Sequence, residues 1–235
     1  MRRLLLLCGL GLLVFSMPVS ALGSYPAGST GYDVSWPNCG ATPPTAAAFG
    51  IVGINDGRVF TGNPCLHEEA SWFNNLALYL STSYPGKPRA LKYPSSPKTC
   101  SLNDENCLAY NYGYNAAHYA VSYAGLQDTH TTSWWLDVET VNSWTSDVTA
   151  NTESLQGMVD ALRHYTFFPS IGFYAYPGQW QALTYGWHND LPTWVATGSL
   201  NRDDALTACT QPSFDGTKVV LTQYTAGLDR NYVCP

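Results

Sequence analysis

Hydrophobic positions along this chain fall into short runs separated by polar, turn-forming segments. The runs are rich in β-branched and aromatic residues and alternate with segments of helical periodicity. This alternation is typical of βα units and predicts a parallel sheet. The expected strands are residues 31–35, 50–55, 78–83, 134–139, 171–176, 193–196 and 219–224, with a further candidate at 231–234. Eight strands are enough to close a barrel.

The helical segments are fewer than the strands. We expect helices at residues 67–77, 108–124, 152–165 and 178–185. The third has the clearest pattern, with Leu155, Met158, Val159, Leu162 and Thr166 spaced along one face. Asn151 offers an N-cap and Glu153 lies in the first turn. The pattern predicts an irregular TIM-like (β/α) barrel of the α/β class, with the final helices missing.

Two long polar segments, residues 84–99 and 198–215, are expected to be loops. Loops of this length in a compact domain are usually functional or disordered, and at the carboxyl ends of barrel strands they would form the walls of a groove. No repeat or linker divides residues 22–235, so these residues are expected to be a single domain.

The first 21 residues have the pattern of a secretory signal. Arg2 and Arg3 precede an apolar run at residues 4–15, and small residues at 19–21 provide a cleavage site. The run is short for a membrane span, and no later segment is apolar enough to hold the chain in a membrane. The mature protein is expected to begin near Leu22 and to be secreted.

Six cysteines remain after Cys8 leaves with the signal. An even number in an exported chain favours disulfides over metal ligands, although six cysteines allow 15 pairings. The pairing that follows from proximity in the sequence is Cys39 with Cys65, Cys100 with Cys107, and Cys209 with Cys234.

The charge of the chain argues against nucleic acid as a partner. The formal net charge is -6, loss of Arg2 and Arg3 makes it more negative, and Lys and Arg do not cluster in the sequence. Binding to duplex nucleic acid requires a basic surface. Aromatic residues are abundant, with 8 Trp and 16 Tyr, while charged residues make up only 12%. Such rings could stack on sugar faces, although most aromatic residues pack in protein cores.

Two carboxylates follow the most hydrophobic strand. Asp137 and Glu139 are one residue apart after the run at 133–136. Side chains two residues apart on a strand point to the same side, about 6.6 Å apart along the backbone. They would therefore share a face with Trp135. Glycoside hydrolysis uses two carboxyl groups, one as proton donor and one ionised. The alternative is a strand end whose acids face water.

Several segments, in one chain order, resemble the glycoside hydrolase family 25 lysozymes, the muramidases of the Chalaropsis type. Residues 31–36 (Gly-Tyr-Asp-Val-Ser-Trp) are similar to the G-x-D-V-S opening strand of that family, and residues 136–139 (Leu-Asp-Val-Glu) to its D-x-E strand. Residues 171–176 resemble the strand with a site tyrosine, and residues 192–196 stand in place of L-W-x-A. Gln223-Tyr224 and residues 229–231 resemble the Q-Y and D-x-N of the family.

The resemblance implies a barrel-shaped, monomeric hydrolase of peptidoglycan or a related polysaccharide that needs no cofactor or metal. Glu139 would be the general acid. Asp137 would stabilise positive charge at the anomeric centre or in a neighbouring acetamido group. Asp33 would complete the catalytic set, and the substrate-binding residues would be Asp229, Tyr174, Trp194, Gln223 and Tyr224.

These acids come from separate strands and are expected to meet at the carboxyl ends of the barrel. Asp33 should then lie near Asp229, and the four carboxylates should line one groove in which repulsion keeps one of them protonated. Whether the reaction retains or inverts configuration stays open, because the two classes differ only in carboxyl separation.

Two segments depart from the family pattern. Residues 53–57 (Gly-Ile-Asn-Asp-Gly) replace K-A-x-E-G, and residues 82–85 (Thr-Ser-Tyr-Pro) replace a Y-H-F type segment. Both lie beside the sugar groove in that fold, which leaves the identity of the glycan open. A non-catalytic glycan-binding protein with the same barrel is the alternative, and a structural protein of the cell envelope is a third reading.

Overall fold

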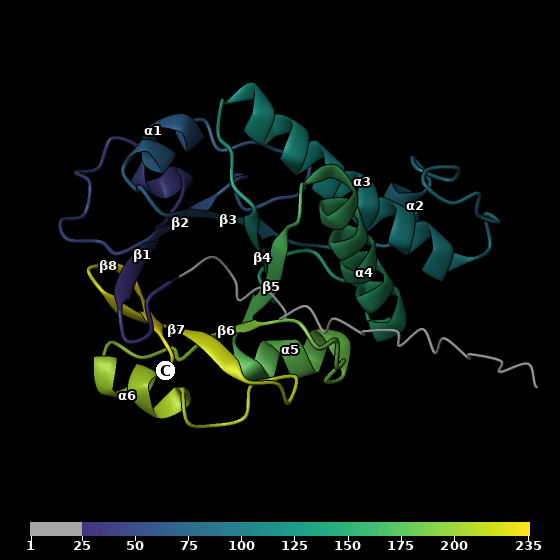
Figure 1. Ribbon diagram of the computed structural model, residues 1–235. Helices are drawn as coiled ribbons and strands as arrows, with labels where there is room; N and C mark the ends of the chain where they lie inside the picture. The colour runs from purple at the N-terminus through teal and green to yellow at the C-terminus, as the bar shows by residue number, and fades with distance from the viewer. Residues whose placement is uncertain (1–24) are drawn as a thin grey trace, which may run out of the picture.

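The computed structural model describes residues 25–235, so the expected signal at residues 1–21 lies outside the described residues (Figure 1). Eight strands close into a barrel in sequence order. They are β1 (Thr30–Val34), β2 (Gly50–Gly53), β3 (Leu76–Ser81), β4 (Ser133–Asp137), β5 (Ser170–Ala175), β6 (Thr193–Ala196), β7 (Val219–Ala226) and β8 (Leu228–Val233). The expected irregular (β/α) barrel is confirmed.

The last strand is what makes the barrel irregular. Strands β1 to β7 run parallel to their neighbours, whereas β8 is antiparallel to both β7 and β1. A tight turn at Gly227, whose φ is +86°, joins β7 directly to β8. A side chain rarely adopts this φ, which explains the glycine. Closure therefore needs no helix after β7.

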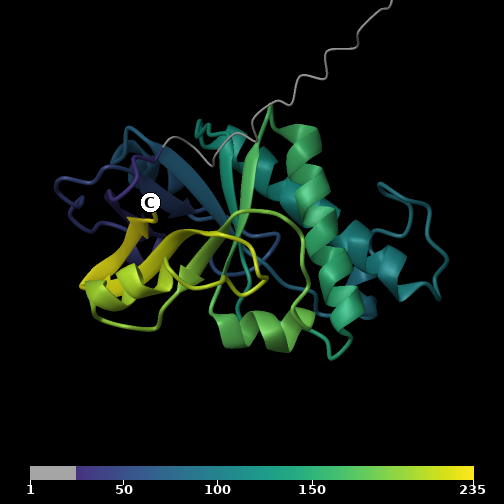
Figure 2. The same cartoon turned by 60° about the horizontal axis from the view of Figure 1, so that its bottom comes forward.

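Six α-helices connect the strands. They are α1 (Leu66–Ser71), α2 (Lys87–Ala90), α3 (Glu105–Leu126), α4 (Val148–Tyr165), α5 (Pro177–Thr184) and α6 (Arg202–Ala208), and a short 3-10 helix (Trp36–Asn38) follows β1. Helices α3 and α4 lie side by side on one flank of the barrel, and β7, β8 and α6 form the opposite flank (Figures 1 and 2). Within residues 25–235, no helix combines the length and apolarity needed to cross a membrane.

Two expected helix boundaries are wrong. Helix α1 ends at Ser71 because Leu76 and Ala77 pair with β2 as the start of β3. Helix α4 begins at Val148 because the side chain of Asp147 accepts hydrogen bonds from the N–H groups of residues 149 and 150, at 3.0 and 3.1 Å. Asn151, the expected N-cap, is instead a buried residue of the helix.

The two segments expected to be loops each contain a short helix. Helix α2 lies within residues 84–99, and α6 lies within residues 198–215, between β6 and β7. The expectation that the final helices are missing is therefore wrong for α6. Both helices bury a single residue, Ala90 in α2 and Ala205 in α6. A single buried position gives no helical periodicity in the sequence.

Aromatic residues fill the interior of the barrel. Trp135 and Trp194 pack edge to face with ring centroids 5.6 Å apart, together with Ile51 and Leu221. Leu136 of β4 belongs instead to the layer between the sheet and the helices. Adjacent residues of β4 thus face opposite layers, as strand geometry requires. Trp135 precedes Asp137 by two residues, so its ring lies on the same face of β4, one position deeper in the barrel.

The three expected disulfides are confirmed. The bonds are Cys39–Cys65, Cys100–Cys107 and Cys209–Cys234. The third joins the segment after α6 to the residue after β8, and so ties the carboxyl terminus to the barrel.

Candidate active site

Polar side chains gather in a cavity of about 170 Å³ where the parallel strands end. Its lining residues are Asp33, Tyr79, Asp137, Glu139, Tyr174, Trp194, Gln223 and Asp229. They include every residue expected in the site except Tyr224. That residue follows Gln223 on β7, so its side chain takes the opposite face of the strand, where it is buried. The structure therefore places Tyr224 outside the cavity.

Strand register brings the four carboxylates together. Asp33 of β1 pairs with Asp229 of β8, and Asp137 ends β4 between Ser81 of β3 and Tyr174 of β5. Glu139 lies two residues beyond Asp137, just past the end of the strand, and its side chain reaches the same cavity.

Asp33 accepts hydrogen bonds from two amides. The Nε2 of Gln223 donates to its two carboxylate oxygens at 3.2 and 3.0 Å, and the Nδ2 of Asn231 donates to Oδ1 at 2.7 Å. The hydroxyl of Tyr174 donates to Oε1 of Gln223 at 2.7 Å. Tyr174, Gln223 and Asn231 therefore fix the position of Asp33 through one directional network.

Burial and like charge raise the pKa of Asp33 to about 7. Desolvation is the larger cause, the negative charge of Asp229 adds to it, and the donors Asn231 and Gln223 oppose it. The carboxyl of Asp33 consequently changes its charge near neutral pH.

The central pair is also shifted toward its protonated form. Burial, followed by the charge of Glu139, raises the pKa of Asp137 well above its ordinary value, while a hydrogen bond with Ser81 lowers it. Burial and the charge of Asp229 raise the pKa of Glu139. Asp137 is 5% exposed, whereas Glu139 is more open to solvent. The cavity can therefore hold a proton donor next to a carboxylate at pH values above the ordinary carboxyl range.

Two residues of this network were not expected from the sequence. Tyr79 lines the cavity from β3, and burial keeps its hydroxyl protonated by raising its pKa. Asn231 is buried and holds Asp33. The alternation of side chains along a strand could have indicated both residues. Asn231 is two residues after Asp229 and Tyr79 is two residues before Ser81, so each shares a strand face with its partner.

The rings around the cavity have different exposures. Tyr174 packs on Trp194 with centroids 4.4 Å apart, and Trp194 is only 2% exposed. Trp194 thus forms the floor of the cavity and is not an open stacking surface. Across residues 25–235, no group of three or more His, Cys, Asp or Glu side chains is arranged to hold a metal ion.

Comparison with solved structures relates this arrangement to known folds. GHIP, a glycosyl hydrolase 25 of Streptococcus pneumoniae that participates in host cell invasion, aligns with a TM-score of 0.55 and 16% identity, over 88% of this chain and 87% of that one. The modular Cpl-1 endolysin, solved in complex with a peptidoglycan analogue, aligns with a TM-score of 0.52 and 18% identity. The alignment covers 88% of this chain and 54% of the endolysin.

A third structure, the CTP1L endolysin, aligns with a TM-score of 0.52 and 12% identity over 87% of this chain and 66% of that one. The expected resemblance to family 25 lysozymes is confirmed at the level of the fold. A family model described as lysozyme-like protein 1 matches residues 105–215, a range that includes Asp137 and Glu139. Comparison with curated proteins gives no match. At these low identities, what the chain shares with the solved structures is the fold.

Proposed function

We propose that this protein is a secreted, monomeric glycoside hydrolase of lysozyme type that cleaves peptidoglycan or a related amino-sugar glycan. The observation that carries the proposal is the set of four carboxylates around one cavity at the strand ends, three of them with raised pKa values. The lysozyme-like family match, the family 25 fold and a relative solved with a peptidoglycan analogue support it. The three disulfides support an oxidising, extracellular location.

Glu139 is the proton donor in this mechanism. It is the more accessible member of the pair, and burial and the charge of Asp229 favour its protonated form. In the reaction, its proton passes to the glycosidic oxygen as the bond from that oxygen to the anomeric carbon breaks. The leaving sugar then departs as a neutral alcohol. Water adds its oxygen to the anomeric carbon, and the proton that it releases restores the acid form of Glu139.

Asp137 stabilises the positive charge that develops on the other side of the broken bond. Its ionisation is coupled to that of its neighbour, because the charge of Glu139 is a cause of its raised pKa. When Glu139 holds the proton, this repulsion is removed and Asp137 ionises more readily. The carboxylate of Asp137 can then face the anomeric centre or the acetamido group of the substrate.

The remaining residues hold the pair and the sugar. The carboxylate of Asp33 is fixed by Gln223 and Asn231 and is available to sugar hydroxyls from the cavity side. Asp229 faces the same space, while its Oδ1 accepts a hydrogen bond from the hydroxyl of Thr225 at 2.6 Å. Tyr174 provides a wall for the sugar.

Purified peptidoglycan is the substrate that tests the proposal. The protein should lower the turbidity of cell-wall suspensions and release soluble fragments with new reducing ends. Saturable binding to the walls without any product would overturn hydrolysis and favour the non-catalytic glycan-binding protein. Absence of both binding and product would reject a glycan function.

A further inference from the structure

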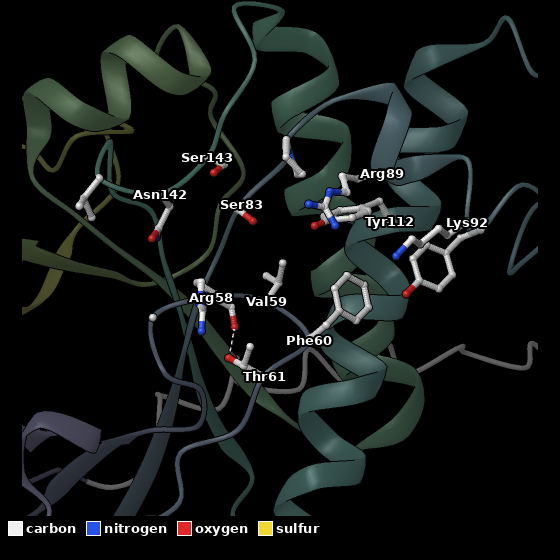
Figure 3. Close-up of a pocket in the computed structure, with 14 residues that line it drawn as sticks. Arg58, Val59, Phe60, Thr61, Ser83, Arg89, Lys92, Tyr112, Asn142 and Ser143 are labelled. Carbon is white, nitrogen blue, oxygen red and sulfur yellow. Dashed lines mark hydrogen bonds between the residues drawn. The ribbon is translucent and has the colours of Figure 1, made fainter.

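A second and larger cavity, of about 650 Å³, lies at the same end of the barrel (Figure 3). The loops after β2, β3 and β4 form it. Its lining includes three cationic side chains, Arg58, Arg89 and Lys92, and three aromatic rings, Phe60, Tyr93 and Tyr112. In Figure 3, Arg89, Tyr112 and Lys92 lie across the cavity from Asn142 and Ser143.

The cationic groups of this cavity are not neutralised by its lining, which includes no acidic residue. Asp56 pairs with Arg58 at 2.8 Å, but within residues 25–235 Arg89 and Lys92 form no ion pair. Both side chains are exposed to solvent. In a chain of net charge -6, this concentration of free positive charge favours an anionic ligand.

Two partly exposed rings, Phe60 and Tyr93, offer apolar surface to a sugar in the same cavity, and the buried ring of Tyr112 packs against both of them. Phe60 stacks on Tyr93 and meets Tyr112 edge to face, both with ring centroids 5.3 Å apart. Aromatic side chains combine a large apolar surface with limited flexibility, so they suit the apolar faces of sugar rings. Charge and aromatic surface together match a glycan unit that carries an acidic group.

One short segment after β4 contributes residues to both cavities. Glu139 lines the first, and Val141 and Asn142, two and three residues further along the chain, line the second. The N–H of Asn142 donates to the carbonyl oxygen of Glu139 at 3.2 Å. A polymer with its reacting linkage at Glu139 would therefore place a neighbouring unit within reach of the second cavity.

Three residues that line the second cavity lie in the segments where this chain departs from the family 25 pattern. Gly57 ends the first departing segment, and Ser83 and Pro85 belong to the second. Arg58 and Phe60 lie one and three residues after the first segment, and Arg89 lies four residues after the second. The segments that depart from the family pattern thus contribute directly to this cavity.

We propose that this basic, aromatic cavity binds a carboxylate-bearing unit of the glycan whose adjacent linkage lies at Glu139. The inference rests on the proposed function and extends it, because it makes the protein selective for acidic over neutral glycans. The carboxylate can belong to the sugar itself, as in a lactyl ether, or to a peptide attached to it. Arg89 and Lys92 are the groups that contact it.

Binding to the Glu139→Gln protein tests the proposal without interference from hydrolysis. The probes are soluble glycan strands with peptide stems, the same strands without stems but with lactyl carboxylates, and neutral N-acetylglucosamine oligosaccharides. Adding Arg89→Gln and Lys92→Gln should weaken binding of an acidic probe about tenfold, a loss typical of two exposed charge contacts. Binding of the neutral probe should stay within about twofold, since no charge contact is lost.

The control protein carries Lys87→Gln and Arg163→Gln together with Glu139→Gln, and it keeps Arg89 and Lys92. It loses the same amount of positive charge as the test variant, but from residues outside the cavity lining. It should leave the acidic probes bound. Added NaCl should weaken the binding of acidic probes more than that of the neutral probe in the protein that keeps Arg89 and Lys92, because salt screens exposed charges.

If Arg89→Gln and Lys92→Gln weaken binding only of the strands with stems, the carboxylate belongs to the peptide. If they weaken binding of both acidic probes, it belongs to the sugar. Either result supports the proposal. Equal loss for the neutral probe, or unchanged binding of both acidic probes, overturns it. Hydrolysis by the unmodified protein is measured separately. Hydrolysis without this selectivity rejects the second cavity alone, and selective binding without hydrolysis rejects the proposed function alone.

Discussion

The raised pKa of Asp33 makes the stability of this protein depend on pH. Its value is about 7 in the folded protein, against 3.8 for the ordinary carboxyl group. The folded state holds this proton more tightly than the unfolded chain does. The stabilising contribution is therefore complete below the unfolded pKa and is lost as pH rises through about 7.

The size of the effect follows from these two values. Their difference corresponds to about 4 kcal/mol, since one pH unit is worth 1.36 kcal/mol. The unfolded carboxyl is already mostly ionised at pH 5, so about 2.5 kcal/mol of this total is lost between pH 5 and pH 8. The raised pKa values of Asp137 and Glu139 act in the same direction.

The matched variant Asp33→Asn isolates this contribution. Urea unfolding with intact disulfides, followed by tryptophan fluorescence at constant ionic strength, gives the free energy of unfolding at each pH. The variant should lose less stability between pH 5 and pH 8 than the unmodified protein, by about 2 kcal/mol. Its absolute stability is not the test, because an amide cannot accept every hydrogen bond that Gln223 and Asn231 donate.

Asp203→Asn serves as the control, because Asp203 is exposed on α6, away from the cavity lining. This variant should keep the pH dependence of the unmodified protein to within about 0.5 kcal/mol. Identical losses in the Asp33→Asn and unmodified proteins would refute the assignment of a buried, repelled carboxyl at position 33. Greater stability of the unmodified protein at pH 8 than at pH 5 would refute it as well.

Three further predictions concern the bridge, the helix pair and the enzyme. Replacing Cys209 and Cys234 by Ala should lower the free energy of unfolding by about 3.5 kcal/mol, the chain-entropy value for 25 residues of separation; an unchanged urea midpoint would contradict it. Gly157→Ala should destabilise the protein by about 2–4 kcal/mol, because the added Cβ would lie 2.1 Å from the carbonyl oxygen of Tyr110 on α3. A thermal midpoint equal to that of the unmodified protein would disprove this close approach. The kcat/KM for peptidoglycan should peak below pH 7 and fall as Glu139 loses its proton, so a maximum at alkaline pH would exclude a protonated carboxyl as donor.

The sequence was sufficient to predict the barrel and most of the acidic site, because both depend on local pattern. Strand runs are visible as short apolar segments, and the carboxyl ends of parallel strands meet at one face. The resemblance to family 25 assigned Asp33 and Asp137, 104 positions apart, to one site, and the meeting of strand ends is the physical reason that they lie together. The pairing of the cysteines by proximity also proved correct.

The remaining features depend on contacts between distant segments. Helices α2 and α6 each bury one alanine and leave no periodic signal. Lys and Arg residues are scattered in the sequence, yet three loops bring Arg58, Arg89 and Lys92 to one cavity. Such a cluster is invisible until the loops are placed. Trp194 was expected to bind the substrate, and only its burial in the structure identifies it as the floor of the cavity.

The central claim is that Glu139 donates a proton to the glycosidic oxygen. The most direct measurement is the rate at which Glu139→Gln and unmodified protein release new reducing ends from purified peptidoglycan, with the fragments identified by mass spectrometry. Glu68→Gln is the matched control, because Glu68 is exposed on α1. The account predicts a loss near the upper end of the roughly 10²–10⁴-fold range for general acid catalysis in Glu139→Gln, with glycan binding retained and the control unaffected. Activity of Glu139→Gln within a few-fold of the unmodified protein would contradict it.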